Sequence, residues 1–276
     1  MTITKSRGAT KRLGPISMGS KIVRFRVKNI DRRFTVHEDL ICKTSKFFKD
    51  RLQKARKPVK GECFVCTEDL DPKIKDLTFC AMCGQNVHVS CIERWKQTAS
   101  IQGNDRSLPT CPMCRHVWEN ESLLTHLRLT DSLEPESVQV YLDWLYSGTV
   151  HIDAAISRDT DTYNVCILQA WEVASVVEDE VFKDKIIQTW FTERRMDFYR
   201  DTVQWAFVEG RGNDEIRAFV IEDFLRFLEP GWFKNYSAGW PRVFSVALAD
   251  AALDRMEDHT TYKGLMRKYM AARSGQ

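Results

Sequence analysis

The 276 residues lack the sequence features of secreted, membrane-spanning and repeat proteins. The N-terminus is polar and basic, without the apolar segment that directs secretion, and no apolar run approaches the length of a membrane span. Internal repeats and low-complexity tracts are missing as well. We therefore expect an intracellular protein, cytoplasmic, nuclear or both, which is not secreted and has no transmembrane segment.

Motifs of enzymes that use their own catalytic group are also missing. The sequence has no phosphate-binding Walker loop, no G-x-S-x-G nucleophile turn and no H-E-x-x-H helix. Two cysteines, Cys42 and Cys166, lie in segments with an apolar period, which is typical of buried core thiols. We therefore expect no chemistry by a nucleophile of this chain.

What the sequence does contain is a dense set of metal-ligand residues between positions 63 and 114. In a reducing compartment, clustered cysteines bind metal or do redox chemistry rather than form disulfides. The spacing is C-x2-C-x13-C-x2-C-x4-H-x2-C-x19-C-x2-C, which gives four close pairs: Cys63/Cys66, Cys80/Cys83, His88/Cys91 and Cys111/Cys114.

Each pair is half of a tetrahedral zinc site, because a two-residue gap lets both side chains turn back onto one ion. Four pairs make two sites in which no position is left for water, which is typical of structural rather than catalytic zinc. The segment is short, polar and rich in loops, so metal binding must supply much of its folding free energy. We predict two structural zinc ions (Zn2+).

Charge is distributed unevenly along the chain. Residues 1–60 carry eighteen Lys or Arg against four Asp or Glu, whereas the rest of the chain is acidic and the total is +3. A basic head of this kind can contact nucleic acid or an anionic surface. It lacks the interleaved aromatic residues of a nucleic-acid platform, which favours a solvated tail and the outward face of a strand instead. We therefore expect neither nucleic acid nor a membrane as a partner.

The chain before the zinc segment predicts a short sheet and a helix. Residues 1–20 offer almost nothing to bury and are expected to form a disordered basic tail. Apolar and basic residues alternate over 22–28, which indicates a half-buried strand, and 33–36 is expected to pair with it. Ser45 stands where a helix N-cap belongs, and Pro58 ends the apolar stripe that follows.

The chain after the zinc segment is expected to be mostly helical. A short strand is predicted around Leu127 and another over Thr149–Ile152. Between them Pro135 suits the first turn of a helix that Gly148 ends. Further helices are predicted over 164–177, 180–195, 198–209, 214–228 (opened by Asn213) and 241–256.

Two segments together resemble the BTB/POZ fold. FTVHEDLICKTSKFF carries the family's His, apolar pair and Ser-x-Phe-Phe, and LRLTDSLEPESVQVYLDWLYSGTV carries its polar turn and W-L-Y-x-G helix end. The helical stretch ILQAWEVASVVEDEVFKDKII is similar to the pair of helices that closes such domains, especially in fungal members. The resemblance implies one α/β domain made of 22–57 and 123–195, with a homodimer or a cullin as partners.

The zinc segment itself resembles a RING finger, in the variant seen alongside SWIM domains. CFVCTEDL, CAMCGQNVHVSCIERWKQ and CPMCRHVW carry the likeness, including the Cys-Gly-x-Asn-x-His run. A PHD finger has the same ligand order but places an aromatic residue before its last cysteine pair, where this chain has Ser107-Leu108-Pro109-Thr110. Pro112 and Arg115, which flank the last pair, are RING-like.

The RING resemblance implies roles for residues of the segment. The first and third pairs would hold one zinc ion and the second and fourth pairs the other: Cys63, Cys66, His88 and Cys91, then Cys80, Cys83, Cys111 and Cys114. In ligases of this family the positions of Val65, Trp95 and Pro112 form a shallow apolar groove for a ubiquitin-conjugating enzyme (E2). The position of Arg115 contacts both E2 and ubiquitin. Alternatively, Trp95 and Pro112 only pack around zinc.

The expected architecture is α+β: a BTB/POZ-like α/β domain (22–57 plus 123–195), an inserted two-zinc RING finger (61–118) and an all-helical C-terminal extension (196–276). Surface loops tolerate such insertions, whereas two small domains in series are the alternative. The expected function is that of a RING-type E3 ubiquitin-protein ligase, without a covalent ubiquitin intermediate, whose BTB and helical parts recruit a protein substrate. The alternative is a non-catalytic interaction scaffold or adaptor.

Overall fold

The computed structural model of the chain describes residues 18–27, 32–102, 109–118, 127–193, 200–209 and 211–256. It is a mixed structure of helices and short strands, so the predicted α+β class is confirmed. The chain divides into two compact units. The first unit contains Met1–Asp131 and Val176–Val181, and the second contains Ser132–Ser175 and Phe182–Gln276. The predicted basic tail over 1–20 lies almost entirely outside the described residues.

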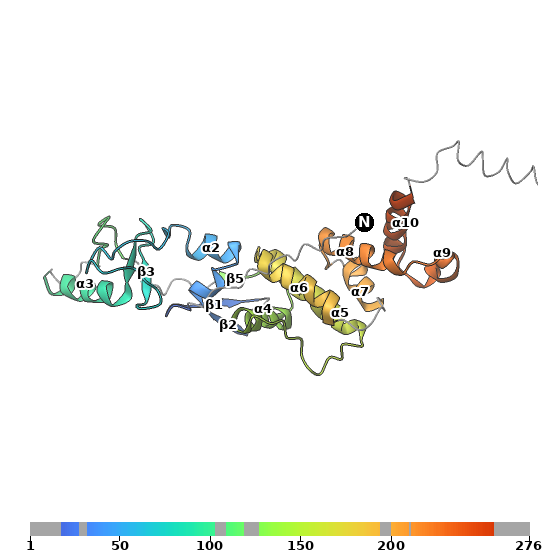
Figure 1. Cartoon of the computed structure of the whole chain (residues 1–276), viewed down its shortest axis with the longest axis horizontal. Helices are drawn as coiled ribbons and strands as arrows, with labels where there is room; N and C mark the ends of the chain where they lie inside the picture. Colours follow the sequence, from blue (N-terminus) through green and yellow to red (C-terminus); the bar gives the residue numbers. More distant parts are fainter. Residues whose placement is uncertain are drawn as a thin grey trace, which may run out of the picture. The chain divides into compact units, whose positions relative to one another are not determined.

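A three-stranded sheet of order β2-β1-β5 forms one part of the first unit (Figure 1). Strand β1 (Ile22–Arg26) pairs antiparallel with β2 (Arg33–His37) and parallel with β5 (Leu127–Arg128). The predicted alternation is confirmed, because every second side chain of β1 and β2 is buried. The predicted turn between these two strands lies outside the described residues.

The chain leaves this sheet through two short helices, α1 (Glu38–Ile41) and α2 (Lys46–Leu52). Ser45 caps α2 as predicted: its Oγ accepts a hydrogen bond from the Phe48 backbone N–H over 3.2 Å. The same hydroxyl donates to the Val177 carbonyl oxygen at 2.5 Å. Ser45 therefore both starts a helix and ties it to the distant segment Val176–Val181.

The region 61–118, called the metal-binding module below, also belongs to the first unit. It contains a two-stranded antiparallel sheet, β3 (Leu77–Phe79) with β4 (Asn86–His88), followed directly by helix α3 (Val89–Gln102). Its apolar core is small and surrounds the cysteines: Leu70, Leu77, Val87, Ile92 and Trp118.

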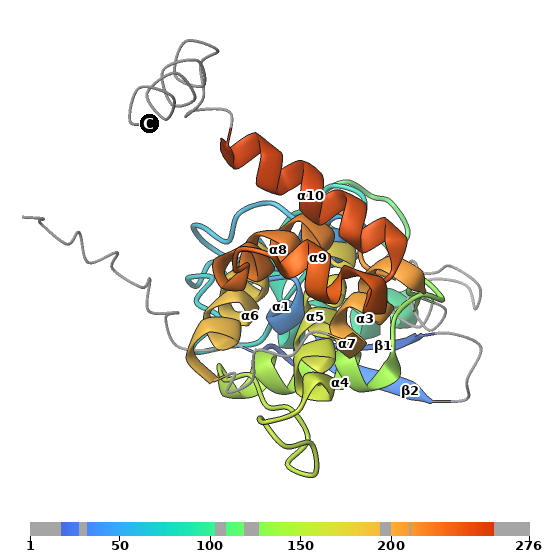
Figure 2. The same cartoon turned by 90° about the vertical axis from the view of Figure 1, so that its right-hand side faces the viewer.

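Helices make up the second unit, and Figure 2 shows α8, α9 and α10 gathered at its C-terminal end. The α-helices that lie wholly or mostly in this unit are α4 (Pro135–Ser147), α5 (Asp161–Val176), α6 (Glu180–Glu193), α7 (Arg200–Val203), α8 (Asp214–Phe224), α9 (Trp232–Tyr236) and α10 (Arg242–Met256). Helix α7 continues as a π-helical turn over Gln204–Val208.

Local signals predicted two of these helix ends. Gly148 ends α4 in the left-handed conformation (φ 73°), and the Asn213 side chain accepts from the Ile216 backbone N–H at 2.8 Å to open α8.

The predicted strand Thr149–Ile152 is wrong: the segment is irregular, and no described strand pairs with it. Its β-forming residues alternate, but a strand also needs a neighbour to bond with. Within the described residues, no helix is both long and apolar enough to cross a bilayer.

Sequence analysis did not predict the short helix α9. Trp232 lacks a side-chain cap before it, and the helix has only five residues. Tertiary packing accounts for it, because the Phe224 ring of α8 stands edge-on to Trp232 and to Trp240, each with ring centroids 5.4 Å apart. Phe224 and Phe244 of α10 pack in the same way at 5.2 Å. Aromatic contacts of this kind stabilise helices too short to form alone.

Candidate metal centres

The eight metal-ligand residues form two tetrads in the first unit. Within each tetrad the ligand atoms all lie within 4.8 Å of one another, so each can hold one metal ion. One consists of Cys63, Cys66, His88 and Cys91, and the other of Cys80, Cys83, Cys111 and Cys114. Among the described residues no other group of three or more such ligands gathers.

Distances within the four-cysteine tetrad fit a tetrahedral ion. With a zinc–sulfur distance of about 2.3 Å, two sulfurs of a tetrahedron lie about 3.8 Å apart. The Sγ atoms of Cys80 and Cys114 lie 3.8 Å apart, and those of Cys83 and Cys111 lie 3.9 Å apart. The spacing therefore suits one small ion bound by all four sulfurs.

The His88 ring is oriented for metal binding through Nδ1. Its Nδ1 lies 3.3 Å from Cys66 Sγ and 3.7 Å from Cys91 Sγ, whereas Nε2 lies 3.1 Å from the Asp69 carbonyl oxygen. A carbonyl only accepts, so Nε2 carries the hydrogen and the lone pair of Nδ1 faces the two sulfurs. Such a backbone acceptor behind a ligating imidazole is common at metal sites.

Three of the four ligand pairs lie in separate backbone turns that have the same conformation. In each turn the N–H of the residue after the second cysteine donates to the carbonyl of the first cysteine, at 2.8 to 2.9 Å. The N–H of each first cysteine then donates to the carbonyl five residues ahead of it, at 2.7 to 3.1 Å. The residue after the second cysteine is left-handed in all three: Thr67 (φ 61°), Gly84 (φ 70°) and Arg115 (φ 62°).

Gly84 is the one of these three that only glycine can occupy. A Cβ at this position would lie 1.6 Å from the backbone oxygen of Ala55, in the segment that follows α2. The same segment binds the module further, because the Lys57 N–H donates to the Gly84 carbonyl at 2.9 Å. Asn86 is also held there: its Nδ2 donates to the Lys57 carbonyl at 2.9 Å, and its Oδ1 accepts from Arg56 Nε at 3.0 Å.

The thiols differ widely in acidity before metal binds. Burial raises the pKa of Cys80 to about 12, despite hydrogen bonds from backbone N–H groups that act to lower it. Burial also acts to raise the pKa of Cys63, but backbone hydrogen bonds at His88, Val65 and Cys66 outweigh it and bring the pKa to about 7. At neutral pH the Cys80 thiol is therefore protonated, and a metal ion must displace its proton.

Acidification is expected to release metal from both tetrads, because protons compete with the ion for the thiolates. As pH falls, more protons must be displaced for each ion bound, so the apparent affinity falls with pH. The measurement is zinc release to a colorimetric chelator across a pH series, with the protons released per zinc counted at neutral pH. Zinc retention independent of pH would contradict thiolate ligation.

The RING resemblance implies an E2 groove at Val65, Trp95 and Pro112, and these side chains are partly exposed at the surface of the module. Trp95 on α3 is 39 % exposed and Val65, in the first turn, is 38 % exposed. Trp95 Nε1 donates to the Thr110 carbonyl at 3.0 Å, which places its ring beside the last ligand turn, where Pro112 is half-buried. Arg115 is exposed in the same turn.

Cys42, Cys166 and His116 belong to neither tetrad. Burial, together with the charges of Glu38 and Asp39, raises the pKa of the buried Cys42 thiol far above its usual range. Cys42 is buried, as predicted. The prediction of a buried core thiol is wrong for Cys166, which is only partly buried, although burial still raises its pKa. His116 is exposed and belongs to neither tetrad.

Sequence reasoning missed the contacts around the ligands. Arg94 Nη2 donates to Cys91 Sγ at 3.8 Å, one turn along α3. Arg56, which joins the module to the preceding segment through Asn86, was not singled out either. A signal was present for Asn86, since it belongs to the Cys-Gly-x-Asn-x-His run.

Comparison of the chain with models of known protein families, with curated proteins and with solved structures returned no match.

Proposed function

We propose that the chain is a RING-type E3 ubiquitin-protein ligase, built on a BTB/POZ-like host and held by two zinc ions. The observation that carries the proposal is the order in which the ligand pairs combine. The first pair meets the third and the second meets the fourth, so the two tetrads interleave along the chain. The RING resemblance implies this arrangement, whereas sites that follow one another along the chain would use neighbouring pairs.

Zinc is the metal that suits both donor sets. Three cysteines with one histidine, or four cysteines, at tetrahedral spacing are typical of structural zinc, and a closed tetrad leaves no position for a reacting water. When bound, the ions supply rigidity and take no part in bond making. Cys63 and Cys66 in the first ligand turn and Cys111 and Cys114 in the last would bind the ions, which would fix the turns that carry Val65 and Pro112.

Val65, Trp95 and Pro112 are proposed to bind an E2. Two of these apolar side chains are more than a third exposed on a module whose core is small, so their exposure is not explained by packing around the metal. Exposed apolar anchors with polar neighbours are typical of protein-binding surfaces. The hydrogen bond from Trp95 to Thr110 would hold the indole ring in place for such a partner.

The proposed mechanism is positioning. The module would bind an E2 that carries ubiquitin as a thioester, and Arg115 would hold ubiquitin so that a substrate lysine attacks the thioester carbon. Orientation of two reacting groups can contribute on the order of 7–11 kcal/mol at its upper end. No intermediate on this chain is required, and the raised pKa of the Cys42 and Cys166 thiols does not favour one.

The host is proposed to be a BTB-like domain made of 22–57 and 123–195, interrupted by the module, with the helical region 196–276 after it. The two compact units do not follow these boundaries, since the first unit joins the initial segment to the module. The proposed division rests on the sequence resemblance. The host domain and the helices would recruit a protein substrate inside the cell. The host could also bind a second copy of the chain or a cullin.

The test is discharge of ubiquitin from a panel of charged E2 enzymes to free lysine. Trp95→Ala is expected to lose E2 binding by on the order of 2 kcal/mol, roughly thirtyfold, while zinc content stays at two. Arg115→Ala should leave E2 binding intact and slow discharge, because it acts on the reactive pose.

Two controls separate binding from folding in this test. Met82→Ala removes an apolar side chain that is 58 % exposed in another ligand turn, and it should behave like the wild type. Trp95→Phe keeps an aromatic ring but loses the hydrogen bond to Thr110. If zinc-loaded wild-type protein accelerates discharge from no E2 in the panel, the ligase proposal fails and a non-catalytic scaffold takes its place.

A further inference from the structure

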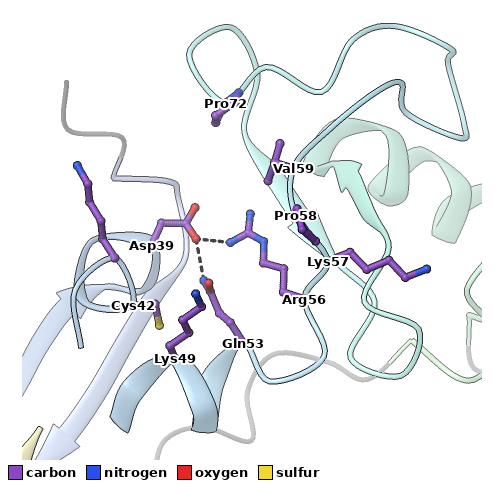
Figure 3. Close-up of a pocket in the computed structure, with 10 residues that line it drawn as sticks. Asp39, Cys42, Lys49, Gln53, Arg56, Lys57, Pro58, Val59 and Pro72 are labelled. Carbon is purple, nitrogen blue, oxygen red and sulfur yellow. Dashed lines mark hydrogen bonds and ion pairs between the residues drawn. The ribbon is translucent and has the colours of Figure 1, made fainter. Parts of the chain in front are cut away.

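A cleft of about 530 Å³ opens in the first unit, beside the metal-binding module (Figure 3). Its walls come from three parts of the chain: α1 with the turn after it, α2, and the segment that leads into the module. Pro72 of the module closes one side. The volume lies within the range of known ligand sites, roughly 300–1,000 Å³.

The one acidic side chain among the described residues that line the cleft is already neutralised. Asp39 Oδ1 accepts hydrogen bonds from Arg56 Nη1 and from Gln53 Nε2, the latter at 2.8 Å. Figure 3 shows these three side chains converging at the middle of the cleft. The ion pair between Asp39 and Arg56 fixes both groups, so neither charge is left over to balance the lysines around them.

Three lysines line the same cleft: Lys43, Lys49 and Lys57. All three are exposed. Lys57 Nζ lies 3.4 Å from the Oε1 atom of Gln85, a neutral acceptor. No ion pair joins Lys43 or Lys49 to another described residue. Lys43 and Lys49 therefore leave this side of the cleft cationic, and an anionic group there would complement their charge.

The wall opposite Lys49 is mainly apolar, and the Lys57 amine on that side points away from the middle of the cleft (Figure 3). Pro58, Val59 and Pro72 lie along the module side of the cleft, opposite Cys42 and Lys49 (Figure 3). Proline fixes its own backbone angle, so this wall is rigid. A ligand that fills the cleft therefore needs both negative groups and apolar groups at short spacing.

We propose that this cleft binds a short acidic peptide segment of another protein, with carboxylates or phosphates at Lys43 and Lys49 and aliphatic side chains against Pro58, Val59 and Pro72. A small free phosphate would use the lysines and leave the apolar wall uncovered. Nucleic acid fits less well, because no aromatic ring among the described lining residues is available to stack on a base.

Binding at this cleft is non-covalent. Cys42, the only thiol among the described lining residues, stays protonated at neutral pH because burial and the nearby carboxylates raise its pKa. The proposal stands on the cleft alone and does not require that the module binds an E2.

The experiment uses the full zinc-loaded chain and three fluorescent peptides. One alternates glutamate with leucine, the second has glutamine in place of glutamate, and the third has phosphoserine in place of glutamate. Anisotropy should show binding of the first, the third or both, no binding of the glutamine peptide, and weaker binding as salt rises. The double variant Lys43→Glu/Lys49→Glu should lower affinity about tenfold or more.

The matched control is the double variant Lys54→Glu/Lys60→Glu, which makes the same charge change at exposed lysines outside the cleft lining. It should keep most of the wild-type affinity. The proposal is overturned if neither anionic peptide binds or if the control loses as much affinity as the cleft variant. Zinc content and circular dichroism of both variants confirm that they are folded.

Discussion

Removal of metal with a strong chelator is expected to unfold the metal-binding module while most of the helical signal of the chain remains. The module's apolar core consists of a few residues around the cysteines, so it buries too little surface to fold without ligation. Structural zinc contributes on the order of 10–16 kcal/mol to small zinc-dependent modules at neutral pH. Metal analysis of the untreated protein should give two equivalents.

Unfolding of the module can be followed through the spectroscopic signal of its tryptophans, because Trp95 and Trp118 lie in the module. Near-ultraviolet circular dichroism should change on chelation and recover when zinc is added back. The second unit is mainly helical and contains no part of either tetrad, so far-ultraviolet ellipticity should fall only in part. A module whose spectrum and melting are the same with and without chelator would show that metal is not structural.

Single ligand variants make the same test site by site. Cys80→Ser should lose the metal of the four-cysteine tetrad, whereas Cys166→Ser, a change at a partly buried thiol outside both tetrads, should keep two equivalents. Cys63→Ser should act on the other tetrad. Loss of zinc in the Cys166→Ser protein would contradict the assignment of ligands.

Gly84→Ala is expected to destabilise the module and its junction with α2 by on the order of 3 kcal/mol or more. A left-handed conformation costs a residue with a side chain roughly 1–2 kcal/mol. At φ 70° that cost adds to a clash, since the new Cβ would lie 1.6 Å from the Ala55 backbone oxygen. Overpacking of a closed site adds about 1–3 kcal/mol, and a backbone atom cannot turn away as a side chain can.

Gly61→Ala is the matched control for this substitution. Gly61 has nearly the same left-handed conformation (φ 74°), but no atom lies within 4 Å of the position its Cβ would take. It should therefore show only the backbone cost. The difference in free energy of unfolding between the two variants, measured in zinc-loaded protein by denaturant titration, isolates the contact with Ala55. Equal destabilisation would show that Gly84 does not approach the Ala55 backbone in solution.

What the sequence by itself determined about this protein is local. The alternation over 22–28, the caps at Ser45 and Asn213 and the left-handed end at Gly148 could be predicted, because each depends on residues within a turn or a few positions. The eight ligand-type residues and their four pairs were equally visible, since a two-residue gap decides whether two side chains can meet one ion.

Spacing alone leaves open which pairs combine, since neighbouring or alternate pairs can equally complete a tetrad. The interleaved order was expected only from resemblance to a family, and in the structure it follows from the β3–β4 hairpin and α3. The orientation of His88 against the Asp69 carbonyl is decided in the same way. Both the pairing order and the orientation of His88 depend on long-range packing, which no local propensity of the sequence encodes.

Only the tertiary structure decided the features that lie between segments far apart in the chain. The approach of Gly84 to Ala55 and the lysine-lined cleft beside it depend on how the module packs against α1 and α2. The same holds for the wrong strand at Thr149–Ile152 and the missed helix α9. A strand needs a partner and a short helix needs packing, and both are supplied by residues distant in sequence.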